Sequence, residues 1–175
     1  DKLIVESDSG VYEAMNKGIG AANGAWILFI NAGDVFIERD FLARQRNILT
    51  TCKNVLYAQS ITEKVSGEVI VKPRDKPKKI DFFFNMPICH QAIFFPANAF
   101  ARHGMFDSRL KISADHEWML RYHSEGGQSF FIKEPFVYYQ SGGLSVQNMD
   151  LNLREKYLVS KAYFSSYLAA RYYYS

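Results

Sequence analysis

Runs of apolar residues alternate along the chain with segments that have apolar positions at helical spacing. Five large apolar residues in a row, 26–30, predict a strand that is covered on both faces of a sheet. A shorter apolar run at 3–5 predicts another strand. The segment 12–22 lies between them, has helical periodicity and is followed by a stop signal at Asn23-Gly24. Strand, helix and strand in this order predict a β-α-β unit with parallel strands.

The rest of the chain continues this mixture of short strands and helices. Further helices are predicted over 40–50, 97–103, 114–124 and 150–174, with a helical turn at 80–85 and with Asp40 and Ser113 as candidate N-caps. Further strands are predicted over 55–60, 68–71, 91–95, 129–132 and 136–139. Ser66-Gly67 is typical of a hairpin turn between two of these strands. The expected fold class is α/β, with a mixed, mostly parallel sheet and helices on both faces.

Composition narrows the class of protein without naming a function. A chain of 175 residues with 48% hydrophobic residues is expected to form one domain with a buried core. The net charge of +3 gives no reason to expect nucleic-acid binding. The spacing of Cys52 and Cys89 predicts neither a disulfide framework nor a zinc site, which fits a reducing compartment. No apolar run is long enough for a transmembrane helix, and no signal peptide is recognised.

Two segments are candidates for contacts with partners. Residues 72–79 carry five basic side chains and predict an exposed loop, which is either a solvated surface or an attraction site for a phosphate-bearing acceptor or an anionic membrane. The aromatic helix expected over 150–174 either packs on the domain, forms a homodimer or touches a membrane, and packing is the default. The chain starts at Asp1 and enters a strand at once, so we expect it to be a piece of a longer protein.

One carboxylate follows the apolar run 26–30. Asn31, Ala32 and Gly33 end the run as turn residues do, and Asp34 comes next. Ligands of open α/β sheets bind just past the carboxyl ends of strands. Asp34 therefore either holds a divalent cation against a diphosphate or only caps the turn.

Several separated motifs, in order, resemble those of family 2 glycosyltransferases. The motifs are D-S-G-V-Y-E-A-M-N-K-G-I at 8–19, A-N-G-A-W at 22–26, N-A-G-D at 31–34, G-M-F-D at 104–107 and A-D-H-E-W-M-L-R at 114–121. The resemblance covers roughly residues 3 to 145. The chain departs from the family in two places: the metal motif has only the second of its usual two aspartates, and the amino-terminal strand and helix that hold the nucleotide base are missing.

The resemblance implies a GT-A fold, which is a Rossmann-like α/β domain. It implies a catalytic domain over 1–149, truncated at its amino terminus, followed by the aromatic helix at 150–175. It further implies inverting transfer of a sugar, of hexosyl or N-acetylhexosaminyl type, from a nucleotide-diphosphate donor to a glycan or lipid-linked acceptor. The expected cofactor is Mg or Mn. The expected setting is polysaccharide synthesis in the cytoplasm, at the inner face of the membrane.

The matching positions receive roles from the same resemblance. Asp115 matches the family's base, and its place in the first turn of a helix favours the ionised carboxylate. Glu117, on another side of that helix, is the backup base or positions the acceptor. Asp34 matches the metal ligand. The residues expected to bind the donor are Asp8, Gly10, Asn16, Asn31 and His90.

Two of these residues, and the function itself, have alternatives. His90 either faces the diphosphate or is a satisfied interior histidine, and Asn16 either has a polar task at the site or hydrogen-bonds from helix to sheet. The rival function is a non-catalytic sugar-nucleotide-binding relic or an assembly subunit. A third alternative is a sugar nucleotidyltransferase, which would need a glycine-rich, basic phosphate loop near its amino terminus. The chain shows none, but because it is expected to be a piece of a longer protein, this alternative stays open.

Overall fold

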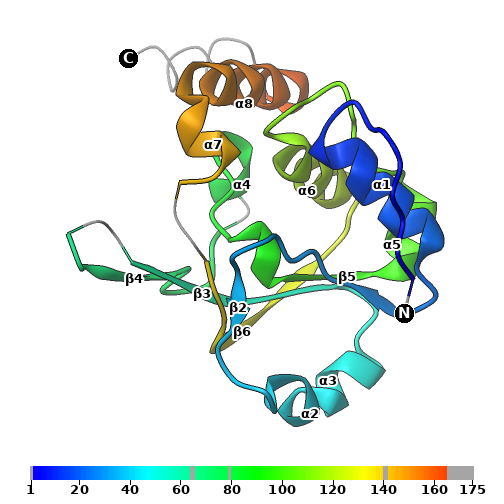
Figure 1. Cartoon of the computed structure of the whole chain (residues 1–175), viewed down its shortest axis with the longest axis vertical. Coiled ribbons are helices and arrows are strands. Elements are labelled where there is room, and N and C mark those ends of the chain that lie inside the picture. The colour runs from blue at the N-terminus through cyan, green and yellow to red at the C-terminus, as the bar shows by residue number, and fades with distance from the viewer. Residues whose placement is uncertain (1, 64–65, 79, 140–141, 165–175) are drawn as a thin grey trace.

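The computed structural model describes residues 2–63, 66–78, 80–139 and 142–164. Its centre is a six-stranded sheet with helices on both faces (Figure 1). The strands follow the order β1-β5-β3-β6-β2, and β4 pairs with β3 beside this path. Their bounds are β1 Trp26–Ile27, β2 Val35–Phe36, β3 Val55–Glu63, β4 Val69–Lys72, β5 Ile93–Pro96 and β6 Ser129–Tyr138.

Strand direction differs from the prediction of a mostly parallel sheet. Within the described residues only β3 and β6 pair in parallel, and the other four pairings are antiparallel. The expected parallel partner of β1 is not formed, because residues 3–5 are exposed and belong to no strand. The pattern of apolar residues detects a strand by its burial, but it carries no information about the partner with which that strand pairs.

The central strands alternate between two cores. Val55 and Tyr57 of β3 belong to one core, whereas Leu56 and Ala58 belong to the other. Because successive side chains of a strand point to opposite faces, this alternation shows that β3 is covered on both sides. Residues 133–135, Lys-Glu-Pro, separated the last two predicted strands. In the structure they lie inside β6, where the register of its pairing with β3 shifts.

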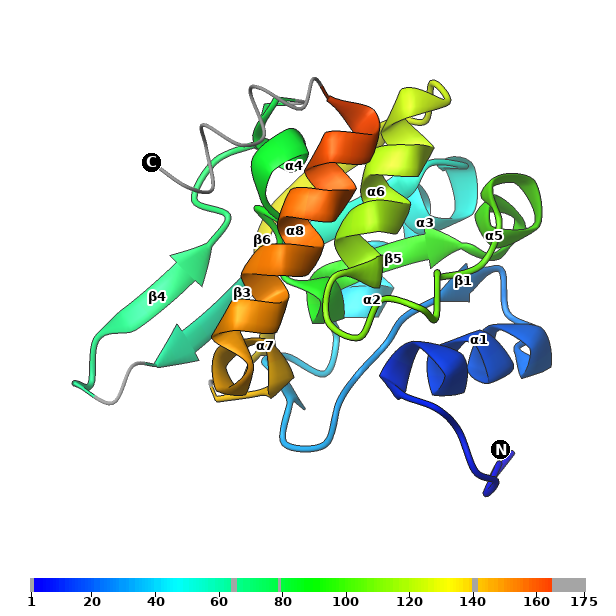
Figure 2. The ribbon, with the colours of Figure 1, turned by 90° about the horizontal axis from the view of Figure 1, so that it is seen from above.

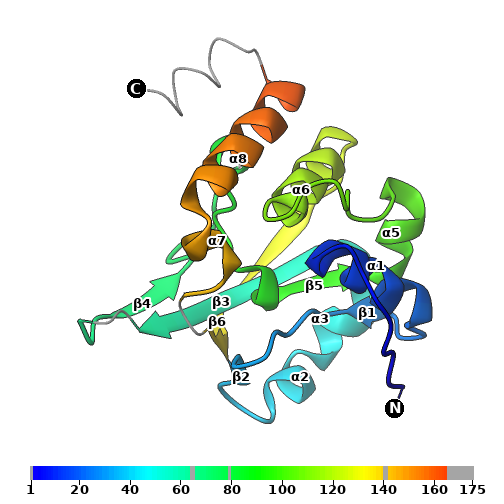
Figure 3. The same ribbon diagram turned by 45° about the horizontal axis from the view of Figure 1, so that its top comes forward.

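Five helices cover one face of the sheet and two short helices cover the other (Figure 3). The first group is α1 Val11–Ala21, α4 Asp81–Phe84, α5 Ala97–His103, α6 Ala114–Ser124 and α8 Met149–Tyr163. The second group is α2 Phe41–Arg44 and α3 Arg46–Thr51. A 3-10 turn, η1 His90–Ala92, precedes β5, and α7 Leu144–Gln147 precedes α8. The expectation of helices on both faces is confirmed.

Two helices differ in detail from their predictions. The segment expected to form one helix over 40–50 divides at Gln45 into α2 and α3. The side chain of Asp40 forms an ion pair with Arg44 rather than a cap on the helix.

The carboxy-terminal helix packs on the domain over its described part. α8 lies beside α6 and α4 (Figure 2), and it buries Asn152, Glu155, Val159 and Ser160. The predicted helix beyond residue 164 lies outside the described residues. Dimer and membrane contacts of this segment stay predictions. No helix within the described ranges combines the length and the apolar character that a membrane span requires.

Candidate active site

Three polar side chains from separate elements meet at the first turn of α6. Asp115 lies in that turn, Tyr12 comes from the first turn of α1, and His90 begins η1. The Tyr12 hydroxyl lies 3.0 Å from Asp115 Oδ1, and His90 Nδ1 lies 3.5 Å from Asp115 Oδ2. The Asp115 side chain is 16% exposed, so it is largely buried but still accessible to solvent.

The surroundings of Asp115 favour its ionised form. Burial alone raises the pKa of this carboxyl, but hydrogen bonding and charge from His90 oppose burial, as do the His116 backbone N–H and the Tyr12 hydroxyl. The balance leaves the pKa of Asp115 below its ordinary value. The His116 N–H donates to Oδ1 at 2.8 Å. Asp115 is therefore a carboxylate at neutral pH, as a general base must be.

The two oxygens of Asp115 are not equivalent. Oδ1 contacts both the His116 N–H and the Tyr12 hydroxyl. The Tyr12 hydroxyl oxygen also lies 2.7 Å from the Ile112 carbonyl oxygen, so its single hydrogen is shared between Oδ1 and that carbonyl. Among the residues that the structure describes, Oδ2 has only the long contact to His90. Burial, followed by the charge of Asp115, raises the pKa of Tyr12 well above its ordinary value, so this hydroxyl stays protonated. Oδ2 is thus the oxygen with room for another hydrogen.

His90 sits in an aromatic setting behind Asp115. Its ring makes edge contacts with Phe29, Phe95 and Phe106, at centroid distances of 5.2 to 5.9 Å. Its Nε2 is buried and has no hydrogen-bond partner among the described residues. An orphaned buried polar atom of this kind is uncommon in proteins. His90 therefore supports Asp115 through Nδ1, while its expected contact with the donor stays a prediction.

Asn16 joins α1 to the loop that precedes α6. Its amide donates to the Phe106 carbonyl at 2.8 Å, and its oxygen accepts the Phe106 N–H at 3.0 Å. This pair of bonds favours the structural alternative for Asn16, although the partner is a loop and not the sheet. Tyr12 and Asn16 stand one helical turn apart, so α1 fixes this loop and the first turn of α6 from the same face.

Asp8 and Gly10, both predicted to bind the donor, shape the entry to α1. The Gly10 N–H donates to Asp8 Oδ1 at 3.1 Å in an exposed turn. Gly10 has a φ of 153°, and Lys111 Nζ donates to the neighbouring Ser9 carbonyl at 3.0 Å. The turn therefore lies against the segment before α6, and donor contacts of these two residues stay predictions.

Asp34 closes a turn directly before β2. The run 26–30, predicted as one strand covered on both faces, forms a strand only at Trp26–Ile27 on the edge of the sheet, and Ile30 is 39% exposed, so Asp34 does not directly follow a central strand. Its Oδ2 accepts the Asn31 N–H at 3.2 Å, and its own N–H donates to the Asn31 carbonyl at 3.1 Å. Burial raises the pKa of Cys89 to about 11, and the charges of both Asp34 and Asp115 add to the rise. Both carboxylates thus act on the Cys89 thiol, and the metal-binding role of Asp34 stays a prediction.

The side chains at Asp34 could hold a divalent cation only weakly, because they supply a single carboxylate ligand. No group of three His, Cys, Asp or Glu side chains with metal-site geometry occurs in the described parts of the chain. Mg-type ions often use one or two protein carboxylates and take their other ligands from water and substrate phosphates. Asp34 fits such an ion, with a bound diphosphate as the main ligand.

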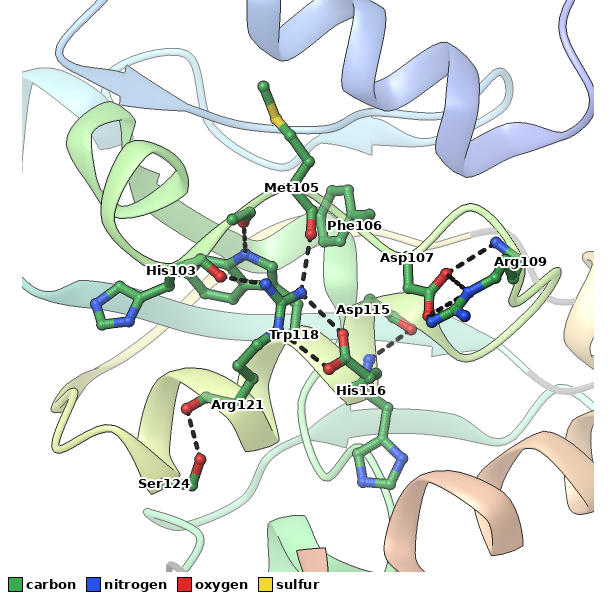
Figure 4. A network of polar contacts seen from close by, with 12 residues as sticks. His103, Met105, Phe106, Asp107, Arg109, Asp115, His116, Trp118, Arg121 and Ser124 are labelled. Carbon is green, nitrogen blue, oxygen red and sulfur yellow. Dashed lines mark hydrogen bonds and ion pairs between the residues drawn. The ribbon is translucent and has the colours of Figure 1, made fainter. Parts of the chain in front are cut away.

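Glu117 contacts other residues than Asp115, chiefly Arg121, whose own contacts are drawn in Figure 4. Its carboxylate pairs with Arg121 at 2.9 Å and accepts the Tyr163 hydroxyl at 2.7 Å. Arg121 also donates to the carbonyls of His103 and Met105, so it ties the end of α5 to α6. Glu117 therefore lies in a structural network, separate from the contacts of Asp115. Its predicted role as backup base is disfavoured by these contacts.

The sequence interpretation missed three residues around Asp115. Tyr12 was inside a quoted motif, but only its contact with Asp115 reveals its role. Lys156 of α8 donates to Asn85 Oδ1 at 2.7 Å. Burial lowers the pKa of Lys156, while the negative charge of Asp115 raises it in part. Glu155, beside it, contacts the segment before α6. Neither residue of α8 lies in a recognisable motif, so no local signal could have identified them.

The fold is that of a GT-A type glycosyltransferase domain. Two structures of Staphylococcus aureus TarS superpose on the chain. TarS 1–349 has a TM-score of 0.60 at 13% identity, and the match covers 94% of this chain and 49% of TarS 1–349. The same protein in complex with UDP-GlcNAc has a TM-score of 0.61 at 13% identity, with coverages of 94% and 51%. At this identity the likeness establishes the fold. No family model matches the chain.

Sequence relatives agree with the fold. The chain is 32% identical over 128 residues to a PGL/p-HBAD biosynthesis glycosyltransferase of Mycobacterium bovis BCG Pasteur. The aligned segment covers 69% of this chain and 47% of that protein. It is 30% identical over 118 residues to an uncharacterized glycosyltransferase of Mycobacterium tuberculosis H37Rv, 66% of this chain and 45% of that protein. The chain is thus a relative of glycosyltransferases, and it spans about half the length of these curated relatives.

Proposed function

We propose that the chain is the core of an inverting glycosyltransferase that moves a sugar from a nucleotide-diphosphate donor to an acceptor hydroxyl. The observation that carries the proposal is the Asp115 carboxylate, which is buried, kept ionised by its contacts, and supplied with one oxygen free for a proton. The named glycosyltransferases among its relatives support the same reaction class.

The proposed step is a single displacement. The acceptor oxygen forms a bond to the anomeric carbon while its proton passes to Asp115 Oδ2. The bond from that carbon to the diphosphate breaks, and the diphosphate leaves with the electron pair. Tyr12 and the His116 N–H hold Oδ1 throughout, so the carboxylate keeps its orientation while its protonation state changes. A positioned general base of this kind contributes about 10²- to 10⁴-fold in rate.

The leaving group is expected on the side of Asp34. A divalent cation, Mg or Mn, would be held there by this carboxylate and the diphosphate, and would stabilise the charge that grows on the leaving group. A UDP-sugar is the leading donor candidate, because UDP-GlcNAc is bound in one structural neighbour. His90, with its unpartnered Nε2, and Asn31, in the turn beside Asp34, are the proposed donor contacts on this side.

The acceptor is proposed to be a glycan or a lipid-linked precursor in the synthesis of cell-surface polysaccharide. The basic loop, described from 72 to 78, is exposed as predicted apart from Pro73 and Pro77. Its cations suit a phosphate-bearing acceptor at the cytoplasmic face of a membrane. The relatives' names support glycosyl transfer and leave the acceptor a proposal.

Calorimetric titration with UDP, GDP and dTDP, each with and without Mn, tests the donor side. We expect one diphosphate to bind in a Mn-dependent way and Asp34→Ala to abolish that dependence. Asp40→Ala serves as the matched control, because it also removes one carboxylate, but one that is exposed, pairs with Arg44 and has no proposed role in donor binding. If no diphosphate binds with or without Mn, the proposal fails.

The rival function, a non-catalytic binding relic or assembly subunit, makes a different prediction. It retains diphosphate binding but releases no diphosphate from any sugar nucleotide, with or without an acceptor. The single carboxylate of the metal motif is the observation that favours it. Release of diphosphate that depends on Asp115 would exclude it.

A further inference from the structure

Glu155 of α8 receives three backbone hydrogen bonds from the segment just before α6. Its Oε1 accepts the Lys111 N–H at 2.7 Å, and its Oε2 accepts the N–H groups of Ile112 and Ser113 at 2.8 and 2.9 Å. Glu155 is 5% exposed. A buried carboxylate whose two oxygens take three successive N–H groups fixes both the position and the orientation of that turn.

The turn held by Glu155 leads directly to the proposed base. Ile112 donates its N–H to Glu155 and accepts the Tyr12 hydroxyl at its carbonyl oxygen. Tyr12 in turn contacts Asp115, which lies two residues after Ser113 on the same backbone. The contacts therefore form one continuous path from α8 to Asp115.

We propose that Glu155 is a positioning residue for Asp115, so that the packing of α8 on the domain assembles the catalytic base. The inference rests on the proposed function, because it assigns Asp115 as the base. It goes beyond that function because it makes the carboxy-terminal helix a part of the catalytic unit, whereas the sequence predicted only a packing or interaction element.

Ser160 provides a matched control on the same helix. It is fully buried, and its hydroxyl donates to the Phe83 carbonyl, so Ser160→Ala weakens the contact between α8 and α4 without touching the 111–113 turn. Glu155→Gln keeps the length of the side chain but places an NH2 group where an oxygen accepted a backbone N–H. Glu155→Ala removes all three acceptor contacts.

The first readout needs no activity. Amide hydrogen exchange of residues 111–113 is expected to be at least about tenfold faster in Glu155→Gln than in the wild-type chain, and unchanged in Ser160→Ala. Equal exchange in wild type and Glu155→Gln would overturn the proposal. If Glu155→Ala does not fold, Glu155→Gln alone decides.

The second readout separates positioning from general stability. Release of diphosphate from the preferred sugar nucleotide is expected to fall about 10- to 100-fold in Glu155→Gln, with the Kd for the free diphosphate unchanged. Ser160→Ala is expected to lower the thermal midpoint and keep its turnover. Equal losses of turnover in the two variants would overturn the positioning role. If the wild-type chain releases no diphosphate, the proposed function fails, and the exchange experiment still decides whether Glu155 holds the turn.

Discussion

Asn16→Ala is the change that best separates a structural role from a donor-binding role within the recognised motif. Asn16 bonds both the N–H and the carbonyl of Phe106, in a partly buried contact between α1 and a loop. Alanine removes both partners, and the Phe106 peptide groups then lose their hydrogen bonds. Phe106 itself is 3% exposed, so water replaces those bonds poorly.

The magnitude follows from the two bonds. At about 1 kcal/mol each, their loss lowers the free energy of unfolding by about 2 kcal/mol. Alanine is the better helix former by a few tenths of a kcal/mol, which offsets part of this loss. For a chain of this size, about 2 kcal/mol corresponds to a drop in thermal midpoint of about 4–8 °C.

Urea denaturation of Asn16→Ala, together with a UDP titration, provides the assay. Asn47→Ala, an exposed position on α3, measures the gain in helix propensity alone and is expected to change stability by less than about 0.5 kcal/mol. The structural role predicts lower stability of Asn16→Ala with unchanged nucleotide affinity. Stability equal to that of Asn47→Ala, with weakened nucleotide binding, would refute it and restore Asn16 as a donor ligand.

Three further predictions concern Asp115, Gly104 and Glu117. The pKa of Asp115 is lower in the folded chain than the unfolded pKa of 3.8. The ionised carboxylate therefore stabilises the fold above pH 3.8, and this contribution is lost as pH falls through the folded pKa. Acid unfolding monitored by circular dichroism should be less steep in Asp115→Asn. Gly104→Ala should cost about 1–3 kcal/mol in urea denaturation, because Gly104 has a φ of +81° and an added Cβ would lie 2.7 Å from Arg121 Nη1; wild-type stability would contradict this strain. Glu117→Gln should lower the thermal midpoint, because it breaks the pair with Arg121, but should keep most of the turnover; a loss equal to that of Asp115→Asn would make Glu117 the base.

Local signals in the sequence predicted several elements well. The predicted bounds of α5 and α6 agree with the structure, and Gly104 ends α5 by a short-range rule. Ser113 precedes α6 as predicted, but its side chain does not cap the helix and its hydroxyl donates to Asn152 instead. The hairpin of β3 and β4 around Ser66-Gly67 is confirmed as an antiparallel pair, because its turn also follows a short-range rule. Turn chemistry and helix ends depend on a few neighbouring residues, which a single sequence displays directly.

Long-range features were harder to predict. The direction of the strands was wrong because β5 pairs with both β1 and β3, and the residues that bring it there are distant in sequence. The motifs located Asp115, but its support comes from Tyr12, His90 and Glu155 on three other elements. Such a network depends on which helices pack together, and no local pattern encodes that choice.

The central claim is that Asp115 is the general base, and turnover of Asp115→Asn tests it most directly. Diphosphate release from UDP-, GDP- and dTDP-sugars would be measured for the wild-type chain and for this variant, with the Kd for the free diphosphate measured in parallel. The account predicts that turnover falls at least about 100-fold while the Kd stays within about twofold. Unchanged turnover in Asp115→Asn would contradict the account.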